Sequence, residues 1–240
     1  MREDVKILFE DNHILVVTKP QNLPVQKDES GDEDLLTLLK QYLIDKYNKS
    51  GDAYLGLVHR LDRPTGGVMV FAKTSKAASR LCQQVKDGEV EKKYFAIVHG
   101  VPKDKQKKLI CHLKKDTKTN NVKIVPALTE GAKYAELDYK ILDSKQNFSL
   151  LAVNLVTGRG HQIRVQMAGM GNPIVGDFRY GEEKIKIPLC LWAVELKFNH
   201  PVSGKRLVFK VYPPEDKPLW NLFNIEQFMR LSVKNNNLYD

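Results

Sequence analysis

The chain has 240 residues, of which 42% are hydrophobic, enough to bury the core of one large domain or two small ones. No stretch approaches the roughly 20 apolar residues of a membrane-spanning helix, and the charged N-terminus lacks the apolar run of a secretory signal. The net charge of +9 favours a polyanionic partner such as nucleic acid, although charge alone also fits a soluble protein with a merely basic surface.

The three cysteines, Cys82, Cys111 and Cys190, form no C-x-x-C pair, and no histidine lies at ligand spacing from them. Such cysteines are typical of reduced thiols that fill small apolar spaces in a cytoplasmic protein. We therefore expect no zinc site and a cytoplasmic location.

The N-terminal part predicts a hairpin followed by a helix. Two short apolar runs, at residues 7–9 and 14–17, are separated by polar residues, as in a β-hairpin. Leucines and tyrosines at helical spacing then predict a helix through residues 35–47, with Asp34 as its N-cap.

The next elements are a buried strand at residues 67–72 and a helix that begins at Thr74 or Ser75 and ends near Gly88. Further on, the chain is mostly β, with a closing helix at residues 219–231. The later strands are predicted at residues 94–99, 132–142, 148–156, 189–198 and 206–212. Strands in series with helices inserted between them favour an α+β fold with a largely antiparallel sheet. Neither regular alternation nor a G-x-G-x-x-G turn supports a dinucleotide-binding fold.

Residues 103–123 are rich in lysine and surround a short apolar run at residues 109–113, which predicts a basic hairpin or arm. It either contacts RNA phosphates or is a solvated surface hairpin, and the segment alone favours neither. No aromatic residue is interleaved with the lysines, so nothing there indicates base stacking. Isolated histidines without a pattern are expected to be structural or exposed: His13, His99, His112 and His200.

The sharpest local signal lies in residues 57–73, LVHRLDRPTGGVMVFAK. Polar side chains occupy a tight loop between two apolar strands, which suits an active site. Asp62 has Arg60 two residues before it and Arg63 directly after it, and neighbouring cations keep a carboxylate ionised, as a nucleophile requires. On the loop alone, a structural Asp–Arg pair that braces the turn is the better explanation.

A second signal lies in residues 155–170, LVTGRGHQIRVQMAGM. Gly158 and Gly160 permit a sharp turn before a predicted helix at residues 161–168. A helix start beside arginines can bind an anion, or Arg164 can pair with Asp62. A helix whose polar face is simply solvated is the plainer alternative.

Tyr94 opens a predicted strand directly after Lys92 and Lys93. It either stacks on a base or completes the core, and by itself the position favours the core. Spacing alone therefore indicates a basic cytoplasmic enzyme or binding protein with one candidate nucleophile, Asp62, and no metal or cofactor motif.

The segment HRLDRPTGG at residues 59–67 resembles the signature of the RluA family of pseudouridine synthases. Residues 7–26 resemble the family's opening motif, residues 92–100 its middle motif and residues 155–181 its third. The four motifs occur in the family's order and cover most of the chain.

The resemblance implies a mixed, mostly antiparallel sheet with flanking helices and a central RNA-binding cleft. It also implies a single catalytic domain, residues 1–240, without an N-terminal accessory RNA-binding domain. The enzyme would act on RNA as a monomer, without a membrane, an obligatory protein partner, a metal or a cofactor. Pseudouridine formation is an isomerisation, so the overall reaction needs no added group.

The resemblance also assigns site residues. Asp62 matches the catalytic carboxylate, and Arg164 matches the cation that pairs with it. Tyr94 matches the aromatic residue that contacts the target uracil, and Arg60 the arginine that fills the gap left by the flipped nucleotide.

Ile163 and Val165 would pack around this site, and Gly66 stands where the family often has serine. Transfer RNA and ribosomal RNA are both plausible substrates, and the lack of an accessory domain tilts the expectation slightly toward transfer RNA. A non-catalytic RNA-binding protein would be expected to have lost Asp62 or Arg164. A metal-dependent phosphoesterase would show more carboxylates near Asp62.

Overall fold

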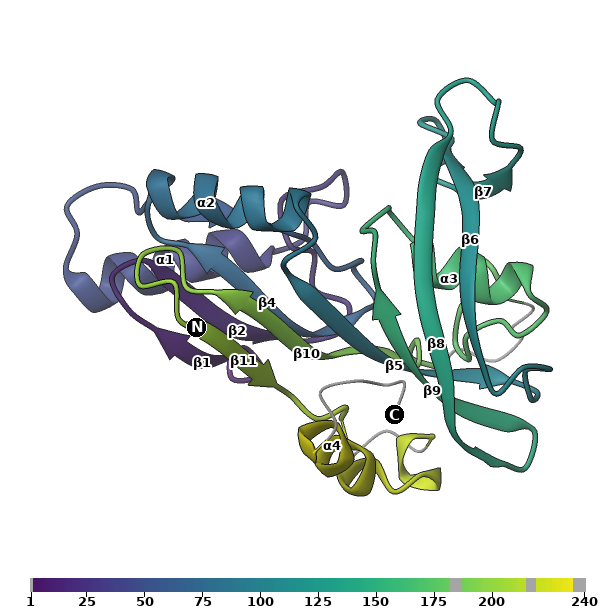
Figure 1. The fold of residues 1–240 in the computed structure, drawn as a ribbon. Helices are drawn as coiled ribbons and strands as arrows, with labels where there is room; N and C mark the ends of the chain where they lie inside the picture. The colour runs from purple at the N-terminus through teal and green to yellow at the C-terminus, as the bar shows by residue number, and fades with distance from the viewer. Residues whose placement is uncertain (1, 182–186, 215–218, 235–240) are drawn as a thin grey trace. The chain divides into compact units, whose positions relative to one another are not determined.

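A computed structural model of the chain describes residues 2–181, 187–214 and 219–234. The chain divides into two compact units. The first consists of Met1–Glu91 and Glu195–Val211, and the second of Lys92–Val194 and Tyr212–Asp240. Both contain antiparallel strand pairs flanked by few helices, so the predicted α+β fold with a mostly antiparallel sheet is confirmed (Figure 1).

The first unit contains strands in the order β1-β2-β4-β10, with β3 paired to β4 and β11 paired to β10, and it includes residues 195–199 of β10. Its strands are β1 (Lys6–Glu10), β2 (Ile14–Lys19), β3 (Gly56–Leu57), β4 (Gly66–Ala72), β10 (Leu191–Asn199) and β11 (Arg206–Lys210). β1 and β2 form the predicted hairpin. All residues of β4 are buried, so the loop that precedes this strand is anchored in the core.

Two helices of the first unit begin at the caps that the sequence indicates. α1 (Leu35–Tyr47) starts at Asp34, whose carboxylate accepts a 3.0 Å hydrogen bond from a backbone N–H of the first turn. α2 (Ser75–Lys86) starts in the same way at Thr74 and packs on β3 and β4. Gly88, just beyond α2, has a positive φ of 76°, as the predicted helix end requires.

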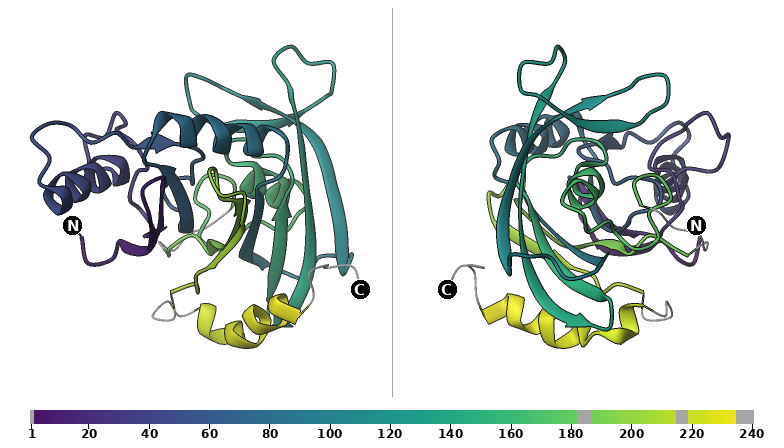
Figure 2. Two further views of the ribbon diagram at one scale, coloured as in Figure 1. Left: turned by 60° about the vertical axis from the view of Figure 1, so that its left-hand side comes forward. Right: turned by 90° about the vertical axis from the view of Figure 1, so that its right-hand side faces the viewer.

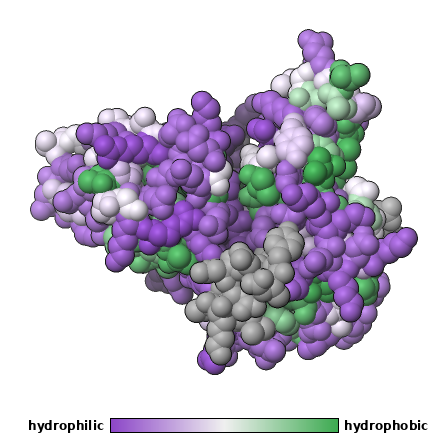
Figure 3. Space-filling model, viewed as in Figure 1, coloured by the Kyte–Doolittle hydropathy of each residue, from purple (hydrophilic) through white to green (hydrophobic). Residues whose placement is uncertain are grey.

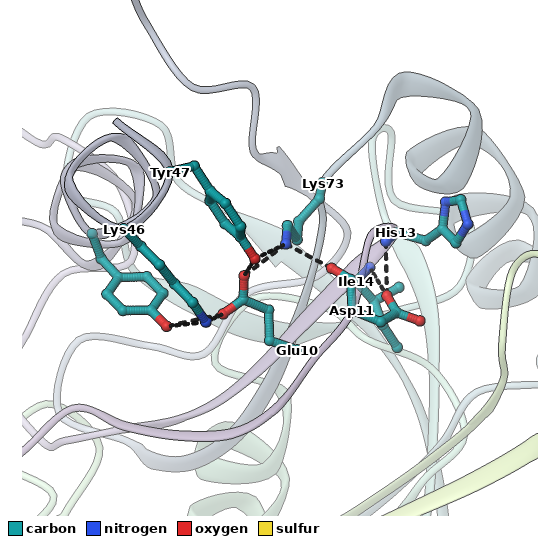
Figure 4. A network of polar contacts seen from close by, with 8 residues as sticks. Glu10, Asp11, His13, Ile14, Lys46, Tyr47 and Lys73 are labelled. Carbon is teal, nitrogen blue, oxygen red and sulfur yellow. Dashed lines mark hydrogen bonds and ion pairs between the residues drawn. The ribbon is translucent and has the colours of Figure 1, made fainter. Parts of the chain in front are cut away.

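A polar network around Glu10 joins β1, α1 and the residue that follows β4 (Figure 4). The Glu10 carboxylate accepts hydrogen bonds from Lys73 at 2.6 Å, from Lys46 and Tyr47 at 2.7 Å and from Tyr42 at 2.9 Å. Burial alone would raise the pKa of Glu10, but these donors outweigh it and lower the pKa to about 2. The network therefore fastens together three elements that are distant in sequence.

The second unit contains strands in the order β10-β5-β9-β8-β6-β7 and includes residues 191–194 of β10. Its further strands are β5 (Glu91–His99), β6 (Gln106–Lys115), β7 (Val122–Val125), β8 (Lys133–Lys145) and β9 (Phe148–Leu155). α3 (Gln162–Gly169) lies on the inner side of this curved sheet, against β6 and β7 (Figure 2). Val165 of α3 packs with Leu113, Val122 and Ala135. The lysine-rich segment is thus a hairpin, as predicted, with one face packed on α3.

The predicted closing helix is wrong in its bounds. The structure has a short 3-10 helix η1 (Trp220–Leu222) followed by α4 (Ile225–Lys234). Phe223 between them is extended, with φ −117° and ψ 149°, and the Asn224 side chain accepts a 3.1 Å hydrogen bond from Gln227 N. Asn224 thus caps a new helix, a signal that helical periodicity alone obscures. Within the described residues, none of the helices is both long and apolar enough to cross a bilayer.

Candidate active site

Asp62 lies on a turn between β3 and β4 of the first unit. The backbone N–H of Thr65 donates to the carbonyl of Asp62 at 2.9 Å, which closes the turn. Asp62 is half-buried and Arg60 is exposed. His59 accepts a 3.2 Å hydrogen bond from Val70 N through Nε2, so its ring continues the pairing along β4 beyond the short β3. The position at which the chain departs from β4 before Asp62 is therefore fixed by this hydrogen bond.

A buried lysine donates hydrogen bonds to the backbone of this turn. Lys19, the last residue of β2, has no exposed surface, and its Nζ donates to the carbonyls of Pro20 at 2.9 Å, Arg63 at 3.1 Å and Thr65 at 2.8 Å. Three carbonyl acceptors match the three N–H groups of an ammonium. Burial lowers the pKa of Lys19 to about 7, an effect that Asp62 opposes and Arg63 reinforces. Lys19 is not recognisable from the sequence, because a lysine at a strand end ordinarily indicates solvent exposure.

Neighbouring side chains complete the support of the turn. Gln21 donates through Nε2 to the carbonyl of Pro64 at 3.0 Å. Arg63 contacts Asp32 and donates to the Ser30 hydroxyl at 3.0 Å, so its guanidinium is engaged with the loop before α1. The backbone that carries Asp62 is thus held from several sides, as a preorganised catalytic carboxylate would require.

Arg164 lies on α3 of the second unit and is buried. Its Nε donates to Oδ2 of Asp177 at 2.8 Å and its Nη2 to Oδ1 at 2.7 Å, a bidentate pair with Asp177 fully enclosed. Asp177 is a second residue that the sequence analysis missed. It belongs to the third family-like motif, where a lone carboxylate after a glycine has no local partner to mark it.

Tyr180 connects this ion pair to the hairpin. Its ring lies 5.2 Å from the Arg164 guanidinium carbon, and its hydroxyl accepts a 3.0 Å hydrogen bond from Val122 N. Burial raises the pKa of Tyr180, and its hydroxyl forms a 2.6 Å hydrogen bond with Nδ1 of His161. Arg164 is therefore positioned by Asp177 on one side and by Tyr180 on another.

The side chain of Gln162, the first residue of α3, binds the turn that precedes this helix. Gln162 Oε1 accepts from Thr157 Oγ1 at 2.8 Å and from Arg159 N at 3.0 Å, and its Nε2 donates to the carbonyl of Glu136 at 3.0 Å. α3 begins one residue later than predicted, because His161 has a left-handed backbone with φ 53°. The alternative of a solvated polar face is wrong, since Gln162 and Arg164 are buried.

Tyr94 lies on β5 of the second unit, opposite Val153 of β9, and is only 5% exposed. Lys92 precedes it by two residues, and burial lowers the pKa of this lysine. A Cβ atom at Gly158 would lie 3.4 Å from Lys92 Nζ, which places the start of β5 beside the turn before α3. Ile163 and Val165 are buried.

The predicted site residues thus fall into two groups. Asp62 and Arg60 belong to the first unit with Lys19, whereas Tyr94 and Arg164 belong to the second with Asp177. The pairing of Arg164 with Asp62 stays a prediction. In the part of the chain that the structure describes, no three or more histidine, cysteine or acidic side chains are grouped so that they could hold a metal ion.

Residues 13–169 match the family model described as RNA pseudouridylate synthase. The ribosomal large subunit pseudouridine synthase D of Zymomonas mobilis subsp. mobilis is 34% identical over 227 residues, which cover 90% of this chain and 71% of that protein. The ribosomal large subunit pseudouridine synthase C of Buchnera aphidicola subsp. Baizongia pistaciae is 33% identical over 211 residues, with 84% and 65% covered.

Solved structures agree with this similarity. Human RNA pseudouridylate synthase domain containing 4 superposes with a TM-score of 0.74 at 25% identity, over 88% of this chain and 89% of that one. Human RNA pseudouridylate synthase domain containing 1 shares the fold, with a TM-score of 0.74 at 21% identity over 97% and 96% of the two chains.

Proposed function

This chain belongs to the RNA pseudouridylate synthase family and is of the RluA type, and we propose that Asp62 is the carboxylate with which it converts uridine in RNA to pseudouridine. The observation that carries the proposal is the support of the Asp62 turn. A half-buried carboxylate stands on a backbone whose carbonyls are bound by the buried Lys19 and by Gln21. A backbone that other residues fix in this way holds the Asp62 carboxylate in a defined position, as catalysis requires.

The reaction breaks the bond between N1 of uracil and C1′ of the ribose and joins C5 of the base to C1′. The hydrogen on C5 is lost as a proton, and N1 gains one, so atoms and electrons balance without a co-reactant. Asp62 either attacks C1′, as the nucleophile of a retaining glycosidase does, or removes the proton from the neighbouring ribose carbon. Both routes require the ionised carboxylate, and Lys19 interacts electrostatically with Asp62.

The other residues receive supporting roles. We assign Arg164 as the ion-pair partner of Asp62, oriented by its bidentate bond to Asp177. Tyr94 contacts the uracil ring, and the exposed Arg60 fills the gap left by the flipped nucleotide.

Ribosomal RNA of the large subunit is the substrate that we propose, because two relatives of this chain carry that substrate in their names. This departs from the slight preference for transfer RNA based on the sequence. We further propose a cytoplasmic monomer, consistent with the basic composition and the free cysteines.

Modification mapping tests the substrate and the activity together. Total RNA from a strain that lacks the gene is incubated with the purified protein, and pseudouridines are mapped before and after. One or a few new pseudouridines in large-subunit RNA are expected. New sites only in transfer RNA would overturn the ribosomal assignment. No new site in any RNA that the protein binds would favour a non-catalytic RNA-binding protein.

A further inference from the structure

The hairpin of β6 and β7, with β8 beside it, has one face packed on α3 and one face turned to solvent. Side chains alternate between the two faces of a strand. Leu113 is 2% exposed on the packed face, whereas Ile110 is 56% exposed on the other. His112 and Lys114 alternate with Leu113 and so share the outer face with Ile110. In Figure 3, hydrophobic side chains stand among hydrophilic ones on the arm formed by these strands.

The strand register assembles a row of rings that the sequence does not show. Tyr134 of β8 and Val125 of β7 both stand opposite His112 of β6. The rings of His112 and Tyr134 are 5.9 Å apart and nearly perpendicular, and Tyr134 is 40% exposed. Single exposed apolar side chains are ordinary on protein surfaces, but a row of two rings and a valine across three strands is a platform.

Cations border the platform on one side. Lys114 and Lys123 are opposite each other in the register, one step beyond His112 and Val125, and both are exposed. Aromatic rings flanked by lysines are the combination that binds single-stranded nucleic acid, because bases stack on rings and phosphates contact cations.

Tyr134 is held in place before any ligand arrives. Its hydroxyl donates to Glu136, and Glu136 also pairs with Lys108 at 2.8 Å. The hydrogen bond to Glu136 raises the pKa of Tyr134, so the ring stays neutral. A ring fixed in this way loses little conformational entropy when a base stacks on it.

The platform is continuous with the supports of Arg164. Arg159 donates through Nε to the carbonyl of Tyr134 at 2.9 Å. Glu136 lies two residues further along β8. Its backbone N–H donates to the Thr157 hydroxyl, and its carbonyl accepts a hydrogen bond from Nε2 of Gln162. Gln162 is the first residue of α3, which carries Arg164. The platform and the helix that carries Arg164 are therefore linked by hydrogen bonds within the second unit.

We propose that the outer face formed by Ile110, His112, Val125 and Tyr134, with Lys114 and Lys123 at its border, binds single-stranded RNA that flanks the target uridine. Bases stack on the two rings, and the lysines contact the phosphates beside them. This inference rests on the proposed function, since it names the surface through which the synthase holds its substrate. It also gives the lysine-rich hairpin a role in which lysines and rings act together.

The test is binding of a fluorescein-labelled oligouridylate of about 12 nucleotides, a length typical of such surfaces. The variant His112→Leu/Tyr134→Leu removes both rings and keeps apolar volume on the strands. Its Kd should rise roughly 10-fold, the size expected for the loss of one or two stacked bases. Tyr212→Ala serves as the matched control, because Tyr212 is 47% exposed but lies outside the hairpin.

The variant Lys114→Gln/Lys123→Gln should reduce the slope of log Kd against log salt by about 1.4, or 0.7 for each phosphate contact on a single strand. Its control, Lys86→Gln/Lys205→Gln, removes the same charge from exposed lysines of the first unit. If the double leucine variant fails to fold by circular dichroism, Tyr134→Leu alone provides the ring test.

Affinity within twofold of the unaltered protein for both platform variants would overturn the proposal, as would equal losses in the controls. A loss that is as large for double-stranded RNA as for the single strand would also overturn it. Failure of the proposed function is a separate result. In that case the unaltered protein forms no pseudouridine, yet the platform variants still lose affinity for the single strand.

Discussion

Replacement of Lys19 by methionine should destabilise the protein by an amount that increases with pH. Lys19 is fully buried, and its Nζ donates to three backbone carbonyls around the Asp62 turn. Methionine has a similar length and no donor, so the variant removes the charge and the hydrogen bonds while the cavity stays filled.

Two opposing effects set the cost below pH 7. The loss of three hydrogen bonds from a cation costs about 1.5 to 3 kcal/mol each. Removing the buried charge stabilises the native state by about 1.36 kcal/mol for each unit by which the pKa is lowered. The pKa of Lys19 is lowered from 10.5 to about 7, so the stabilisation gained by removing the charge is roughly 5 kcal/mol. The net destabilisation at pH 6 is therefore about 2 kcal/mol.

The pH dependence has a definite sign. Between pH 7 and 10.5 the unfolded chain keeps the proton on Lys19 and the native protein releases it, so native stability rises with pH. This contribution is complete above pH 10.5 and is lost as the pH falls through about 7. Methionine has no such contribution. The destabilisation caused by Lys19→Met should therefore be about 2 to 3 kcal/mol larger at pH 9 than at pH 6.

Urea unfolding followed by far-UV circular dichroism at pH 6 and pH 9 measures the difference. Lys205→Met is the control, because Lys205 is an exposed lysine of the same unit. Its effect should be small at both values. A Lys19→Met destabilisation that is equal at the two pH values, within about 0.5 kcal/mol, would refute the lowered pKa of Lys19.

Three further predictions concern the ion pairs and the chemistry. Arg164→Lys should fold and bind RNA but turn over more than about 10-fold more slowly, because lysine cannot make two parallel bonds; near-normal turnover in the tritium-release assay would show that the guanidinium is dispensable. Glu10→Gln should lower the free energy of unfolding by about 1 to 2 kcal/mol at pH 7. This loss should disappear as the pH falls from 4.5 toward 2, since the pKa of Glu10 is lowered to about 2. A loss of stability that stays constant during acid unfolding would contradict this. Prolonged dialysis against a strong chelator should leave turnover unchanged, and a loss that one added metal restores would refute the metal-free mechanism.

Local signals in the sequence were sufficient for most elements. α1 could be predicted because Asp34 caps it and leucines recur at helical spacing, and β4 because a run of apolar residues follows the Pro-Thr-Gly-Gly turn. The lysine-rich hairpin followed from a short apolar run between basic flanks. Each of these signals lies within about a dozen residues of the element that it specifies.

Features that depend on contacts between distant segments could not be predicted. Lys19 is recognisable only once the three carbonyls from residues 20, 63 and 65 surround its Nζ. The partnership of Arg164 with Asp177 spans 13 residues and a change of direction after α3. His112 showed no pattern, because its aromatic neighbour Tyr134 comes from another strand through the register of β6 and β8.

The central claim, that Asp62 is the catalytic carboxylate, is tested most directly by Asp62→Asn. Asparagine keeps the size and most of the hydrogen-bonding capacity but removes the charge and the nucleophile. RNA from a strain lacking the gene, labelled with tritium at C5 of uridine, releases tritium when C5 joins C1′. Asp52→Asn is the control, because it neutralises an exposed aspartate of the same unit.

Binding and folding are measured alongside, since lost affinity would imitate lost chemistry. We predict that Asp62→Asn folds, binds RNA as the unaltered protein does and releases no tritium above background, while Asp52→Asn releases it normally. Substantial tritium release by a folded Asp62→Asn protein would contradict the assignment of Asp62.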